Sequence, residues 1–167
     1  MKNKTTAINF DQEADMLYPT LNKVEELLKE YQMVPVFYEV LADYMTPIRM
    51  FQALRKEGTP CFMLESVENK DQWGRYSFIG INPKSEIKIS GKELEVDGVK
   101  QEEKFKMSYL SDLIEKYKSP VMEDYPKLTG GLIGYFGYDM IRQVEKKLTN
   151  VPEDDLKMPE CHLCMYD

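Results

Sequence analysis

The chain has 167 residues, of which 43% are hydrophobic and 31% are charged, a composition typical of one globular domain rather than of a disordered protein. Acidic residues outnumber basic residues 29 to 22, and this balance argues against nucleic acids and anionic membranes as partners. No apolar run approaches the roughly 20 residues that span a bilayer, and three cysteines cannot all pair, so we expect a cytoplasmic protein in a reducing compartment.

The first third of the chain predicts a helix, a strand and a second helix. Apolar residues at helical spacing indicate an amphipathic helix over residues 21–31, and residues 33–41 are expected to form a strand. Thr46 is suited to cap the next helix, Pro47 suits its first position, and Gly58 is expected to close it.

From residue 61 onward the pattern has the period of a β-strand. Strands are expected at residues 61–64 and 76–81, with a polar turn between them, and alternation predicts two more around residues 87–89 and 94–96. The pair Asp97-Gly98 is a strong signal for a two-residue hairpin turn. The middle of the chain is therefore expected to form an antiparallel meander with one solvated face.

The last third adds a helix over residues 109–117, a glycine-interrupted strand over residues 130–138, a short helix over residues 139–146 and a final strand over residues 161–167. These elements together predict an α+β fold. We expect one domain, residues 1–167, in which about three to four helices pack on a twisted, mainly antiparallel β-sheet.

The final strand contains a Cys-His-Leu-Cys sequence that invites a metal or redox interpretation. A strand would place Cys161 and Cys164 on opposite faces, and no second Cys/His pair exists to complete a tetrahedral site. We therefore expect structural cysteines and no metal site. His162 is the only histidine, so any catalytic pair of a histidine with a serine or a cysteine would have to use it. Because it lies near the very end of the chain, we expect no such pair and predict no catalytic residue.

The remaining candidates for function are Glu65, Ser66 and Arg75. One interpretation is an ion pair across a hairpin, without a ligand. The other is a pocket for an amino acid, in which Glu65 faces an ammonium group, Ser66 exchanges hydrogen bonds and Arg75 faces a carboxylate. Because adjacent strand residues point to opposite faces, the second interpretation requires the strand to end or bulge there, or one residue to contribute backbone groups.

Four ordered stretches of the sequence, residues 43–47, 64–66, 73–80 and 130–139, resemble the amino-terminal region of anthranilate synthase component I. The resemblance extends from about residue 10 to the last residue. It implies a full-length protein that converts chorismate and ammonia to anthranilate and pyruvate, with the ammonia delivered by a glutamine amidotransferase subunit. It also implies a magnesium ion in a catalytic region that follows this segment.

The same resemblance assigns roles to the three candidates. L-Tryptophan inhibits the family by binding a separate site, to which the Leu-Glu-Ser motif contributes. Glu65 and Ser66 match that motif, and Arg75 occupies a place where related enzymes carry a basic residue near the inhibitor, although loop lengths differ there. Part of the inhibitor pocket is expected to come from the catalytic half.

The chorismate-binding half of the family, with its magnesium ligands and its acid and base groups, is absent from the 167 residues. We therefore expect no cofactor in this chain and no anthranilate-forming activity from the chain alone. Its expected partners are L-tryptophan, the catalytic domain and the amidotransferase subunit.

Three alternatives remain open at the level of sequence. The first is the amino-terminal part of aminodeoxychorismate synthase component I, in the folate branch, although Glu65 and the run over residues 74–78 favour the tryptophan branch. The second is a stand-alone amino-acid-binding regulatory module. The third is a scaffold that binds only the amidotransferase subunit.

Overall fold

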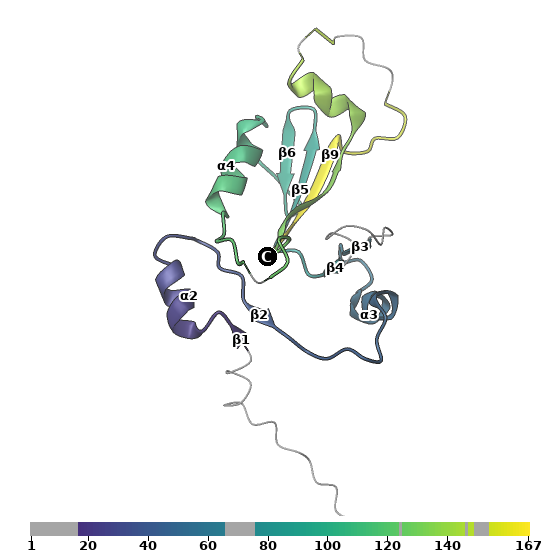
Figure 1. Cartoon of the computed structure of the whole chain (residues 1–167). Helices are drawn as coiled ribbons and strands as arrows, with labels where there is room; N and C mark the ends of the chain where they lie inside the picture. The colour runs from purple at the N-terminus through teal and green to yellow at the C-terminus, as the bar shows by residue number, and fades with distance from the viewer. Residues whose placement is uncertain (1–16, 66–75, 124, 146, 149–153) are drawn as a thin grey trace, which may run out of the picture.

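The protein is described by a computed structural model, in which a five-stranded antiparallel sheet has the strand order β7-β6-β5-β9-β8 (Figure 1). The structure describes residues 17–65, 76–123, 125–145, 147–148 and 154–167. The strands of this sheet are β5 (Ser85–Ser90), β6 (Glu93–Val96), β7 (Val99–Lys100), β8 (Gly131–Phe136) and β9 (Cys161–Tyr166). The final strand of the sequence thus lies between two earlier ones rather than at an edge.

The turn between β6 and β7 has the geometry that its sequence predicts. Asp97 and Gly98 both have positive φ, 52° and 78°, as a two-residue type I′ turn requires. The Asp97 carboxylate accepts hydrogen bonds from the Glu86 amide at 2.7 Å and from the Ser85 hydroxyl at 3.1 Å. The predicted hairpin at residues 97–98 is confirmed, and its turn is tied to β5.

One face of the five-stranded sheet carries the hydrophobic core. Helix α4 (Ser108–Lys116) lies along this sheet beside β6 and β5 in Figure 1, and the 3₁₀ helix η2 (Tyr138–Gln143) follows β8. Strand register places apolar side chains of β5 and β9 opposite one another. The buried cluster consists of Ile87, Ile89, Leu94, Phe105, Leu110, Met140, Cys161 and Leu163.

One glycine of β8 allows close approach to β9. A Cβ atom at Gly134 would overlap the carbonyl oxygen of His162 on the neighbouring strand. Only a residue without a side chain fits there.

Two small units precede the five-stranded sheet. Strand β1 (Leu17–Tyr18) pairs with β2 (Phe37–Tyr38), and helix α2 (Leu21–Leu27) lies between them in sequence. The prediction of a helix over residues 21–31 and of a strand over residues 33–41 was therefore too long in both cases. Helix α2 buries none of its residues, so no tertiary packing extends it, and β2 has only the two residues of β1 as partners.

Helix α3 (Pro47–Leu54) begins as predicted and ends early. The Thr46 hydroxyl accepts a hydrogen bond from the Arg49 amide at 3.3 Å, so the predicted cap is confirmed. The chain becomes extended at Arg55, however, and Gly58, with φ of 75°, lies in the turn that follows. The prediction that Gly58 closes this helix was wrong because the helix ends at Leu54, four residues before it.

The predicted α+β class, with a mainly antiparallel sheet, is confirmed. The third helix occurs one residue earlier than predicted, and the predicted short helix over residues 139–146 is a 3₁₀ helix that ends at Gln143. Cys161 and Cys164 lie on opposite faces of β9, also as predicted. No helix in the described parts of the chain combines the length and the apolar character needed to cross a bilayer.

Candidate functional site

The predicted ligand-binding acid lies at the end of a separate antiparallel hairpin. Strand β3 (Phe62–Glu65) pairs with β4 (Ser77–Gly80), and helix α3 lies beside them in Figure 1. Glu65 is the last residue of β3, is exposed to solvent and is opposite Ser77.

The other two predicted residues, Ser66 and Arg75, lie outside the residues that the structure describes. The assembly of Glu65, Ser66 and Arg75 into one site therefore stays a prediction. Strands β3 and β4, whose described residues include Glu65, contribute Phe62, Phe78, Ile79 and Gly80 to the wall of a cavity.

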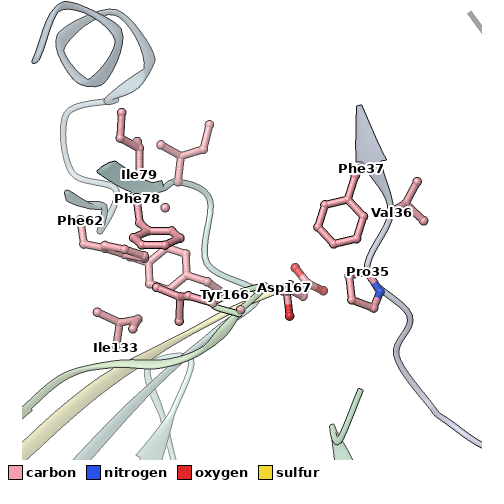
Figure 2. A pocket seen from close by; sticks show the side chains of 14 residues that line it. Pro35, Val36, Phe37, Phe62, Phe78, Ile79, Ile133, Tyr166 and Asp167 are labelled. Carbon is pink, nitrogen blue, oxygen red and sulfur yellow. The ribbon is translucent and has the colours of Figure 1, made fainter. Parts of the chain in front are cut away.

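The cavity has a volume of about 370 Å³, which is at the lower end of the range of roughly 300–1,000 Å³ for small-molecule sites. It lies between the hairpin, the segment that leads into β2, and the ends of β8 and β9 (Figure 2). Its lining residues are Pro35, Val36, Phe37, Phe62, Phe78, Ile79, Gly80, Ile81, Leu128, Thr129, Gly130, Ile133, Tyr166 and Asp167.

Aromatic packing attaches the hairpin to the five-stranded sheet at one wall of this cavity. The Phe62 ring meets the Tyr166 ring edge to face, with 4.8 Å between centroids and planes at 80°. Phe62 reaches this position by lying across Gly80, where a Cβ atom would overlap its ring. Figure 2 shows Phe62, Phe78 and Tyr166 side by side, with Phe37 on the opposite wall.

The polar groups at the cavity are few, and they are neutral or already paired. The Asp167 carboxylate pairs with the Lys84 ammonium at 2.8 Å. Desolvation, together with the neighbouring Cys164 and Cys61, raises the pKa of the Tyr166 phenol to about 12, so this group is neutral at pH 7. The cavity is therefore suited to a flat apolar group and offers no nucleophile with an adjacent base.

Strand alternation places Glu65 on the face of the hairpin opposite to Phe62 and Phe78, two aromatic residues of the cavity wall. Side chains alternate along a strand, so Glu65 shares a face with Met63, whereas Phe62 lies on the face of the cavity. In Figure 2, the Ile79 side chain points away from Phe62 and Tyr166, although Ile79 also lines part of the cavity. Sequence reasoning found the hairpin but missed the cavity, because the walls come from segments far apart in the chain and no local pattern links them.

Three curated relatives of this chain are all anthranilate synthase component 1 proteins or an anthranilate synthase alpha subunit. The chain is 41% identical over 162 residues to anthranilate synthase component 1 of Acetivibrio thermocellus, a match that covers 91% of this chain and 31% of the relative. It is 33% identical over 144 residues to anthranilate synthase component 1 of Pseudomonas aeruginosa, covering 82% of this chain and 29% of the relative. It is also 33% identical over 169 residues to the chloroplastic anthranilate synthase alpha subunit 2 of Arabidopsis thaliana, a match that covers 92% of this chain and 27% of the relative.

The chain spans about three tenths of the length of the curated relatives it matches. Among solved structures, it is similar to anthranilate synthase component I from Streptococcus pneumoniae TIGR4, with a TM-score of 0.47 and 29% identity over 78% of this chain and 28% of that chain. No family model matches the sequence.

Proposed function

Because this chain belongs to the anthranilate synthase component I family and corresponds to its amino-terminal region, we propose that it serves an enzyme that forms anthranilate and pyruvate from chorismate and ammonia. Within that enzyme we assign it the site at which L-tryptophan, the end product of the pathway, inhibits. The observation that carries the proposal is the 41% identity to a relative over 91% of the chain.

Exposed apolar side chains support the proposal that further protein packs on this region. Leu41 and Tyr44, between β2 and α3, are 93% and 94% exposed, and Leu21 at the start of α2 is 73% exposed. Side chains of this size that are almost fully exposed are among those that a second protein would cover. We propose that the catalytic domain and the glutamine amidotransferase subunit are the proteins in question.

The described residues do not fit a magnesium ion. Among them, three potential ligand atoms come close together only at Glu86, His162 and Cys164. Magnesium prefers six oxygen ligands, whereas this group supplies a nitrogen and a sulfur. We therefore assign the magnesium of the reaction to a catalytic region outside this chain and derive no step through it here.

The proposed inhibitor site uses the end of the β3–β4 hairpin. Glu65 would pair with the ammonium group of tryptophan, Ser66 would exchange hydrogen bonds with it, and Arg75 would pair with its carboxylate. Tryptophan can inhibit only if it binds one arrangement of the two domains better than the other, so its binding must be coupled to that arrangement.

The test uses the full-length protein of which this chain would be the amino-terminal part. Ser66→Leu places a branched side chain beside the proposed ligand, so we expect the tryptophan concentration for half-inhibition to rise at least about tenfold, which is roughly 1.4 kcal/mol of lost binding. Anthranilate fluorescence would follow initial rates with and without tryptophan, and basal turnover should change less than twofold.

Ser111→Leu is the matched control, because Ser111 is exposed on α4 and far in sequence from the hairpin. Unchanged tryptophan sensitivity in Ser66→Leu would refute the inhibitor site. Formation of aminodeoxychorismate in place of anthranilate would instead assign the protein to the folate branch.

A second experiment tests the proposal that the 167-residue chain alone is inactive. The purified chain would be incubated with chorismate, ammonium and magnesium, and we expect no anthranilate above the background of the buffer. Ammonia-dependent turnover by the chain alone would show that it carries catalytic groups, and the assignment of catalysis to another domain would then be abandoned.

A further inference from the structure

The face of the five-stranded sheet opposite the core carries a compact group of ionisable side chains. Glu86 and Lys88 of β5 lie beside Cys164 and His162 of β9, because the register pairs Glu86 with Cys164 and Lys88 with His162. Both strands are interior to the sheet and are hydrogen-bonded on both sides. The backbone beneath this group is therefore held rigidly.

Three of these side chains bring potential metal ligands together. One carboxylate oxygen of Glu86, a ring nitrogen of His162 and the sulfur of Cys164 lie within 4.8 Å of one another. The Nε2 atom of His162 is 2.6 Å from the Oε1 atom of Glu86. Cys164 is only 6% exposed, whereas the side chains of Glu86 and His162 are each 29% exposed, so an ion could reach the group from solvent.

We propose that Glu86, His162 and Cys164 bind a divalent transition-metal ion of the zinc class. Thiolate sulfur, imidazole nitrogen and carboxylate oxygen are the donors that zinc takes in proteins, and three protein ligands leave a fourth position for water. The carboxylate and the thiolate together balance the two positive charges of the ion.

The geometry needs only small side-chain movements to accept the ion. Tetrahedral zinc with bonds of about 2.0–2.3 Å places its ligand atoms roughly 3.3–3.8 Å apart, so Glu86 and His162 separate slightly and Cys164 moves inward. The His162 ring meets the Tyr135 ring edge to face, and the Tyr135 hydroxyl donates to the Pro159 carbonyl at 3.0 Å. A held Tyr135 limits the orientations that the imidazole can adopt.

Lys88 is the group that competes with the ion. Its ammonium lies 3.1 Å from Glu86 and also 4.0 Å from Glu95, so it can shift to Glu95 when the metal occupies Glu86.

Bound metal would connect the two interior strands β5 and β9 across the solvent-accessible face. Because the three ligands are brought together only by folding, the ion binds the folded chain better than the unfolded chain. The consequence is a melting temperature that rises with zinc concentration.

The test titrates the untagged 167-residue chain with zinc after treatment with a chelator, using cobalt(II) as a spectroscopic probe. We expect one equivalent of cobalt to produce a sulfur-to-metal charge-transfer band, which zinc then removes. Because the chain has a single histidine, the imidazole NMR signals report on His162 alone, and they should shift as zinc is added.

Two ligand variants and two controls sharpen this test. His162→Gln and Cys164→Ser should each weaken zinc binding at least about tenfold, whereas Cys61→Ser, a thiol outside the group, should not. Lys88→Met should strengthen binding, since it removes the competing ammonium.

If a ligand variant fails to fold, the histidine NMR signals and the cobalt band of the unaltered chain still show whether His162 and a cysteine bind the metal. The proposal would be overturned if zinc bound without shifting the His162 signals. It would also be overturned if both ligand variants bound zinc as tightly as the unaltered chain, or if the unaltered chain bound no equivalent of zinc at micromolar concentration.

Discussion

Cys161 and Cys164 differ in surroundings although they are only three residues apart on one strand. Cys161 is completely buried in the core, and desolvation raises the pKa of its thiol to about 11. Cys164 lies on the opposite face, beside Glu86. The strand period of two, visible in the sequence, is the reason that these thiols do not act together.

This difference predicts the order in which the thiols react. At pH 8 a pKa of about 11 leaves Cys161 with roughly 90 times less thiolate than a cysteine with the ordinary pKa of 9.0, and burial restricts access further. Mass spectrometry after timed alkylation should show Cys61 labelled first and Cys161 only after unfolding. Equal labelling rates at Cys61 and Cys161 would contradict the buried position of Cys161.

Glu86 predicts a pH-dependent contribution to stability. Desolvation alone would raise its pKa, but hydrogen bonds from Lys88 and His162 outweigh that effect and lower it from 4.5. A carboxylate with a lowered pKa stabilises the folded chain above the unfolded value, near 4.5, and loses this effect as the pH falls through the folded value.

We therefore expect Glu86→Gln to lower the free energy of unfolding by about 0.5–1 kcal/mol at pH 7, since the pair is partly exposed. As the pH falls through the folded pKa of Glu86, the two proteins should converge. Urea unfolding in chelator-treated buffer at pH 7 and pH 3 measures both differences, and an equal loss at the two pH values would argue against an ionic contribution.

The elements of the five-stranded sheet depend on where glycine occurs. Gly134 of β8 contacts the β9 backbone so closely that no Cβ atom fits, whereas Gly91, in the turn between β5 and β6, has open space around it and a φ of 57°. The first glycine is required by packing and the second by backbone conformation.

Alanine at these two positions should have unequal effects. Gly134→Ala forces β8 away from β9, and we expect it to cost more than about 3 kcal/mol or to prevent folding. Gly91→Ala should cost only about 1 kcal/mol, because the strain is local. Circular dichroism and urea unfolding of both variants provide the comparison, and similar losses would mean that the β8–β9 contact is looser than described.

Stability is distributed unevenly over the whole molecule. The buried cluster draws its residues from β5, β6, β9, α4, η2 and Phe105, whereas α2 and α3 contain no buried residue. Segments with few buried apolar contacts open at low free-energy cost.

Amide hydrogen exchange should therefore divide the chain into two classes. We expect the interior strands β5 and β9 to exchange slowest, near the rate set by global unfolding, and the two-stranded β1–β2 pair with α2 to exchange fastest. Equal protection in α2 and β9 would show that the amino-terminal segments are more firmly packed than their exposure indicates.

Local patterns in the sequence determined the α+β class, the start of α3 after Thr46, the turn at Asp97-Gly98 and the strands β3 and β4. Each depends on interactions within a few residues, such as a cap, a positive φ or strand alternation. The lengths of α2 and β2 could not be predicted in this way, because they depend on partners distant in the sequence.

Only the tertiary structure decided the position of β9 between β5 and β8, and with it the two features that local patterns missed. One is the aromatic cavity, whose walls come from segments more than 100 residues apart, such as Phe37 and Tyr166. The other is the Glu86–His162–Cys164 group, in which alternation puts His162 and Cys164 on one face but the pairing of β9 with β5 supplies the carboxylate. Strand order is set by burial of the whole apolar face, which no short window of sequence contains.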